Sequence, residues 1–229
     1  MKLFFSKIQQ AFESRDNKAV RTNDFISYGE DNNYPLYLKD LYDYSSIHSS
    51  CVDAIVQGII GKGLTNPNEN ILEQEINKEG ETLMDIFEKI AVDDYLFGGH
   101  AYEVIWTNDG SQIAELYHVD FSKVRVSEQD DYGHDLGYWI KNQWNKRSYY
   151  NTSDTEAVYI PAFNPDYARE DKKQLYYHKS YTPTNSVYPL PQYQGAVKAI
   201  DIDRNIDDFH LNNLKNGMTP SLAVITYTG

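Results

Sequence analysis

Apolar side chains in the first third of the chain recur at helical spacing, which predicts consecutive helices. Pro35 opens one helix that extends to about Tyr44. The next helix, from about Ser46 to Ile60, is apolar on nearly every side, so we expect it to be central in the fold rather than superficial. We also expect its thiol, Cys51, to be packed and inert.

A further helix is predicted to start at Thr82, because Thr82-Leu83-Met84-Asp85 is similar to a capping box. Its apolar stripe is spaced i, i+3, i+4, i+7 and i+8 from Leu83 to Ala91, and Gly98-Gly99 ends the helix. Three residues beyond the stripe lies Asp94, which predicts a carboxylate on the buried side. Such a carboxylate must be hydrogen-bonded or paired, and we favour a structural role in accepting backbone N–H bonds near the glycines.

From residue 100 the apolar positions alternate, which is typical of strands. Segments 100–107 and 112–119 are joined by Asn108-Asp109-Gly110, a strong signal for a hairpin. Further strands are predicted at about 123–126, 137–144, 157–163, 175–181 and 223–227.

A long helix is predicted from about residue 192 to 214. Its apolar stripe is Ala199, Ile202, Ile206 and Phe209, whereas the charged residues Asp203, Arg204, Asp207 and Asp208 lie away from that stripe. Helices followed by a mainly antiparallel sheet and then another long helix predict an α+β fold.

The same pattern divides the chain into three parts. Residues 1–27 form a basic amphipathic helix and arm, and residues 28–190 form the α+β domain. Residues 191–229 hold the long helix and the start of a further strand, which we expect to continue into a carboxy-terminal part.

Composition narrows the possible functions. The chain has 34 Asp and Glu against 21 Lys and Arg, a net charge of −13, so it lacks the overall basic footprint of a protein that wraps nucleic acid. Its 41% hydrophobic and 14% aromatic content is too high for a disordered acidic tail. No segment approaches the run of about 18 apolar residues that spans a membrane, and no membrane partner is expected.

Catalytic motifs are mostly absent from the sequence. G-x-S-x-G, H-E-x-x-H and paired CxxC do not occur, and no two of the six histidines are spaced i, i+4. We therefore assign no catalytic, cofactor-binding or metal-binding residue, and we expect no enzymatic activity.

Two alternatives remain open from the residues alone. A metal-dependent hydrolase or nuclease would use Asp93, Asp94 and Glu103, although neither a partner base nor a basic cluster accompanies them. A monomeric binding module would hold a glycan or a protein on exposed aromatic side chains. Ligand addition would then change the fluorescence of Trp106, Trp139 or Trp144. Aromatic rows in strands, however, more often fill a core.

An ordered set of short segments resembles the portal proteins of tailed bacteriophages. No single piece is specific, and the resemblance rests on their order across residues 25–229. The pieces are Tyr28-Gly29-Glu30-Asp31-Asn32-Asn33-Tyr34-Pro35, Ser46-Ile47-His48-Ser49, Gly58-Ile59-Ile60-Gly61-Lys62-Gly63-Leu64, Asp94-Tyr95-Leu96-Phe97-Gly98-Gly99, Val119-Asp120, Val124-Arg125, Tyr188-Pro189-Leu190-Pro191 and Asn216-Gly217-Met218-Thr219-Pro220.

The resemblance implies a structural role. Portal proteins form a dodecameric ring at the unique capsid vertex of the virion, through which DNA is packaged and ejected. They assemble in the host cytoplasm and bind terminase, the major capsid protein and head-completion or adaptor proteins, and they are conduits rather than enzymes. The chain would then be the amino-terminal, wing-like portion of such a protein, since family members are considerably longer. Double-stranded DNA would pass through the channel non-specifically.

Overall fold

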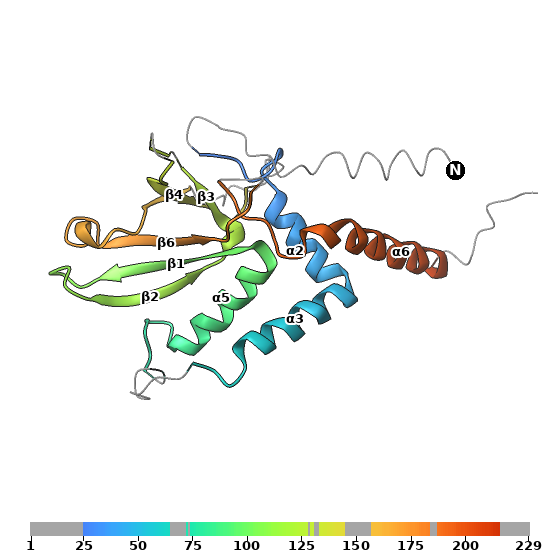
Figure 1. The fold of residues 1–229 in the computed structure, drawn as a ribbon, viewed down its shortest axis with the longest axis horizontal. Coiled ribbons are helices and arrows are strands. Elements are labelled where there is room, and N and C mark those ends of the chain that lie inside the picture. Colours follow the sequence, from blue (N-terminus) through green and yellow to red (C-terminus); the bar gives the residue numbers. More distant parts are fainter. Residues whose placement is uncertain are drawn as a thin grey trace, which may run out of the picture.

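The computed structural model describes residues 25–64, 72, 74–127, 129–130, 133–144, 157–183 and 187–215. Within these residues the fold is mixed α+β, as predicted, with three helices and then two small antiparallel sheets and a long helix (Figure 1). The predicted amino-terminal helix and the predicted strand at 223–227 lie outside the described residues.

Three helices lie where the apolar spacing predicts them. They are α2 (Tyr34–Tyr44), α3 (Ser46–Ile60) and α5 (Leu83–Phe97). The Ser45 hydroxyl accepts the backbone N–H of His48 and thereby caps α3. At α5, Thr82 and Asp85 form the predicted capping box, and each side chain accepts the backbone N–H of the other residue. Gly98, in the left-handed conformation at φ 84°, ends α5.

The larger sheet has the order β2-β1-β6, with every pair antiparallel. Its strands are β1 (Gly99–Trp106), β2 (Ile113–Val119) and β6 (Lys173–Lys179), and the predicted hairpin joins β1 to β2. The smaller sheet has the order β3-β4-β5, again antiparallel. Its strands are β3 (Val124–Val126), β4 (Gly137–Ile140) and β5 (Val158–Pro161).

The larger sheet has different neighbours on its two faces. On one face, the Asp93 carboxylate of α5 lies 2.8 Å from the His118 ring nitrogen of β2. On the other face, the ring of Tyr177 stacks on Phe121 and on Tyr138 of the smaller sheet, with centroids 5.1 and 4.9 Å apart. The main core therefore lies between the two sheets and under α2, and aromatic side chains fill much of it.

Several segments that carry the portal resemblance meet in this core. The Arg125 guanidinium donates to both the side-chain and the backbone oxygen of Asn32, at 2.5 and 2.9 Å. Gly98 lies directly against the backbone of Leu190, where a Cβ atom would collide. Segments about 90 residues apart in the sequence are thus side by side in the fold.

The long helix α6 (Val197–Lys215) follows a single 3-10 turn at Gln194–Ala196. Its first half is attached to the rest of the described chain. The Ser45 hydroxyl donates to the Asp203 carboxylate at 3.2 Å, and Val197 and Asp201 are buried. Beyond residue 204 nearly every side chain is exposed, and the helix extends outward from the body (Figure 1).

Candidate functional site

Helix α3 lies at the surface, so the prediction that it is central was wrong. Only His48, Val52 and Val56 are buried, and they follow one another at i+4 spacing. A second i+4 row lies beside them and faces outward. This α3 row consists of Ile47, Cys51, Ile55 and Ile59, with exposed fractions of 64% at Ile47 and 51% at Ile59.

Cys51 belongs to this exposed row and is a free, exposed thiol, which corrects the prediction of a packed cysteine. The apolar character of α3 misled that prediction, because burial was inferred from hydrophobicity alone. A helix that is apolar on two sides buries one of them within this chain and leaves the other uncovered. Contiguous exposed apolar surface of this kind marks an interaction site.

A second uncovered apolar surface lies on α6. The α6 stripe, Ala199, Ile202, Ile206 and Phe209, matches the predicted residues but is exposed along its whole length. At 3.6 residues per turn these positions lie on the side of α6 opposite to buried Val197 and Asp201.

The inner side of α6 carries an ion pair beside its buried apolar residues. Arg204, which lies away from the stripe as predicted, is 17% exposed and pairs with the Asp201 carboxylate at 2.7 Å. The helix thus packs Val197 and Ile200 against the core together with the Asp201–Arg204 pair, and it leaves a second apolar surface, the α6 stripe, exposed. An ordinary surface helix leaves only polar residues on its outer side.

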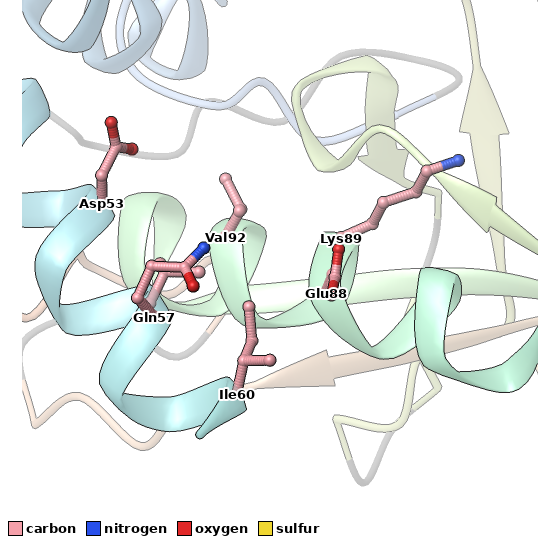
Figure 2. A pocket seen from close by; sticks show the side chains of 7 residues that line it. Asp53, Gln57, Ile60, Glu88, Lys89 and Val92 are labelled. Carbon is pink, nitrogen blue, oxygen red and sulfur yellow. The ribbon is translucent and has the colours of Figure 1, made fainter. Parts of the chain in front are cut away.

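A shallow groove of about 380 Å³ runs between α3 and α5 (Figure 2). Its apolar lining is Val56, Ile60 and Val92, and its polar lining is Asp53, Gln57, Glu88 and Lys89. Two of the charged groups already have partners in the chain. The Tyr42 hydroxyl donates to Asp53 at 2.7 Å, and Lys89 pairs with Glu81. The groove thus combines open aliphatic surface with one further exposed carboxylate, Glu88.

The structure separates the three carboxylates of the hydrolase hypothesis. Asp93 contacts His118, and Asp94 contacts His100 at 3.0 Å, both on the α5 side of the larger sheet. Glu103 lies on the opposite face of β1, since strand residues alternate, and pairs with Lys173 at 2.8 Å. The described ranges contain no group of three or more His, Cys, Asp or Glu side chains placed to hold a metal ion.

The buried carboxylate is Asp93, one residue away from the predicted Asp94. Asp93 is 7% exposed and accepts the backbone N–H of Phe121 at 3.2 Å, whereas the Asp94 side chain is 37% exposed. Burial raises the pKa of Asp93, and the hydrogen bond with His118 acts against that rise. The predicted structural role is thus filled by the neighbouring residue, which joins α5 to the turn after β2.

The three tryptophans serve different parts of the fold. The Trp106 indole donates to Gln174 at 3.1 Å, and the Trp144 indole donates to the Lys123 carbonyl at 2.9 Å. Trp139 meets Tyr159 edge to face, with centroids 5.3 Å apart. The aromatic side chains of the binding-module hypothesis therefore do not gather around one tryptophan-lined site.

Arg125, which belongs to one of the segments that carry the portal resemblance, is a fully buried cation whose burial the sequence did not predict. Its guanidinium donates to the carbonyl oxygens of Ser122 and Val124 as well as to Asn32, and it lies 5.1 Å from the Trp144 ring centroid. Burial lowers the pKa of Arg125 to about 10. Its many neutral acceptors define a structural clamp between β3 and the segment before α2.

Among the described residues, no helix combines the length and the apolar character needed to cross a membrane. No family model matches the chain, and no curated protein matches it.

The fold is shared with chains of gene transfer agent particles. A chain from the virion of the native particle superposes with a TM-score of 0.60 at 18% identity, covering 93% of this chain and 51% of that one. A chain from the neck of the native particle, computed with C12 symmetry, gives 0.62 at 18% identity with the same coverage. A chain from the neck of the empty particle, computed with C6 symmetry, gives 0.60 at 17% identity and covers 82% and 48%. This chain thus spans about half the length of those chains.

Proposed function

We propose that this chain is a structural part of a portal protein, the ring at the unique capsid vertex of a tailed phage or phage-like particle. The observation that carries the proposal is the fold shared over 93% of the chain with a subunit of a neck computed with C12 symmetry. The portal resemblance, drawn from the order of short segments, points independently in the same direction. The α+β part up to residue 190 corresponds to the wing, and α6 leads on from it.

The exposed apolar helices support assembly into a ring. A subunit that functions alone has no reason to leave the α3 row and the α6 stripe uncovered. In an oligomer the same side chains are buried against neighbouring copies. The expected copy number is twelve, by analogy with the family.

Charge supports a role as a conduit for DNA. At a net charge of −13 the chain repels phosphate, so double-stranded DNA slides past it without binding. The expected protein partners are terminase, the major capsid protein and head-completion or adaptor proteins. The ring assembles in the host cytoplasm and resides in the virion, and no turnover of any substrate is expected.

Negative-stain imaging tests the proposal. The sample is the full product of the reading frame, including any residues encoded beyond Gly229. Rings with an axial channel are the expected result. A uniform monomer at micromolar concentration, measured by native mass spectrometry on the same sample, would overturn the proposal.

A further inference from the structure

A closed ring of more than two copies needs two different contact surfaces on each copy. A surface that pairs with itself produces only a two-fold dimer, whereas a heterologous contact passes from copy to copy until the ring closes. The described residues offer two exposed apolar helix surfaces, the α3 row and the α6 stripe. We propose that the α6 stripe of one copy packs on the α3 row of the next copy. This inference rests on the proposed ring.

The α3 row has the shape of a receiving surface. Small residues lie beside its isoleucines, namely Cys51 within the row and Ala54 and Gly58 next to it, all exposed. A Cβ atom built on Gly58 meets nothing within 4 Å, so the surface there is open. Residues at i+4 spacing form a ridge, and the small side chains next to it leave a groove for the ridge of another helix.

The α6 stripe supplies the matching ridge. Ile202, Ile206 and Phe209 are each about half exposed, and they point away from their own chain because Val197 and Asp201 occupy the inner side. The outer half of α6 extends beyond the body, which leaves it free to reach a neighbouring copy (Figure 1). A helix anchored at one end and apolar on its outer side is suited to heterologous packing.

Charge also fits this pairing. The one charged residue within α3 other than histidine is Asp53, which lies on the groove side and engages Tyr42, so the α3 row carries no charge that burial would desolvate. The α6 stripe consists of apolar residues, and Asp207 and Asp208 lie away from it, so packing the stripe on the α3 row desolvates no charged side chain of either row.

Cys51 allows a direct test, because it is the one cysteine of the 229 residues and lies in the α3 row. Ile202→Cys, Ile206→Cys and Phe209→Cys are each introduced into the full reading-frame product, with any cysteine beyond Gly229 replaced by serine. The samples are oxidised, or treated with a short bis-maleimide. A contact between different copies predicts a ladder of covalent oligomers from at least one variant, because each copy links to the next on both sides.

Three controls make the test specific. Removing the thiol in the row, Cys51→Ser, must abolish the ladder. Leu211→Cys places an exposed cysteine on another side of α6 and must give no ladder. Gln57→Cys, combined with Cys51→Ser and the same α6 cysteine, places the thiol on the groove side of α3 and must give no ladder either.

Imaging separates failure of this inference from failure of the proposed function. Rings that form without any link to Cys51, or that link through residue 57 or residue 211 instead, overturn the pairing and leave the portal proposal intact. Absence of rings in the unmodified product overturns the portal proposal itself. A ladder that ends at the dimer overturns the heterologous contact.

Discussion

The rings of Tyr28 and Tyr188 stack almost parallel, with centroids 4.1 Å apart and planes inclined by 8°. The Tyr28 hydroxyl donates to the Pro189 carbonyl at 2.8 Å, and the Tyr188 hydroxyl donates to the Ile26 carbonyl. Tyr188 also accepts the backbone N–H of Val126 at 3.0 Å. The pair thus joins the start of the described chain, β3 and the segment before α6 in one buried cluster.

Replacing Tyr188 by phenylalanine keeps the stacked ring and removes the hydroxyl. The buried N–H of Val126 and the carbonyl of Ile26 then lose a partner, and each unsatisfied group costs about 1–3 kcal/mol. We expect Tyr188→Phe to lower the free energy of unfolding by about 2–6 kcal/mol, measured by urea denaturation. Tyr181→Phe is the control, since Tyr181 is 91% exposed, and equal effects of the two substitutions would contradict the buried network.

Two features of Gly98 require glycine, its backbone conformation and its close contact with Leu190. Comparison with Gly133 separates the effects of the two. Its φ of 84° disfavours any residue with a Cβ atom, and that atom would also collide with the Leu190 carbonyl. Gly133 has nearly the same φ, 85°, but open space around the same position. We expect Gly133→Ala to cost about 1–2 kcal/mol and Gly98→Ala about 1–3 kcal/mol more. Thermal and urea unfolding of both variants check this, and equal losses would show that the contact with Leu190 is unimportant.

The sequence predicted most elements because local signals specify them. Pro35, the Thr82–Asp85 capping box and the turn at Asn108-Asp109-Gly110 act through their immediate neighbours, and each lies where it was expected. The packing side of a helix is not a local property. For α3, hydrophobicity identified the apolar residues but wrongly predicted that they are buried on nearly every side. For α6, it identified the apolar stripe but not its exposure.

Candidate site residues were predictable only in part, because side-chain direction and long-range contacts decide which residues meet. Asp94 and Asp93 differ by 100° around α5, and the apolar stripe alone does not fix which of them points at the turn after β2. The burial of Arg125 was not predicted, since its acceptors are neutral oxygens, of which those of Asn32 lie 93 residues away in the sequence. The ring that the resemblance implies remains a proposal, which the exposed α3 row and α6 stripe support.

Asp93 and Asp94 should respond differently to the same substitution. Asp93→Leu leaves the buried N–H of Phe121 without an acceptor, so we expect a loss of about 1–3 kcal/mol in unfolding free energy. Asp94 is more exposed and holds only His100, so Asp94→Leu should cost less than about 1 kcal/mol. Chemical denaturation at neutral pH compares the two. A larger loss of unfolding free energy for Asp94→Leu than for Asp93→Leu would support the sequence-based prediction that Asp94 is the structural carboxylate.

Buried tyrosines predict unfolding at alkaline pH. Burial raises the pKa of Tyr28, Tyr177 and Tyr188 above the ordinary value of 10.0. A group whose pKa is raised on folding contributes stability that is complete below its unfolded pKa and is lost as pH rises through its folded pKa. Stability should therefore fall above pH 10.

The lowered pKa of Arg125 acts in the opposite direction, but it is one group against several tyrosines. Phenolate absorbance measures the ionisation of the tyrosines as the pH rises, and circular dichroism measures unfolding in the same titration. Exposed tyrosines such as Tyr181 should ionise first, and the buried ones should ionise together in a cooperative step that coincides with loss of circular dichroism. Gradual ionisation of all tyrosines near pH 10 would contradict the buried cluster.

Val52 and Ile55 are three residues apart on α3 and should have opposite roles. Val52 is fully buried against α5, so Val52→Ala should lower the unfolding free energy of the monomer by about 1–3 kcal/mol. Ile55 is 40% exposed in the α3 row, so Ile55→Gln should change monomer stability by less than about 0.5 kcal/mol.

Assembly should respond in the opposite way to these two substitutions. If Ile55 is buried between copies in the ring, Ile55→Gln buries an amide without a partner and should weaken association more than Val52→Ala does. Unfolding at low protein concentration and ring counts at high concentration measure the two effects. Normal assembly of Ile55→Gln would exclude the α3 row from the contact between copies.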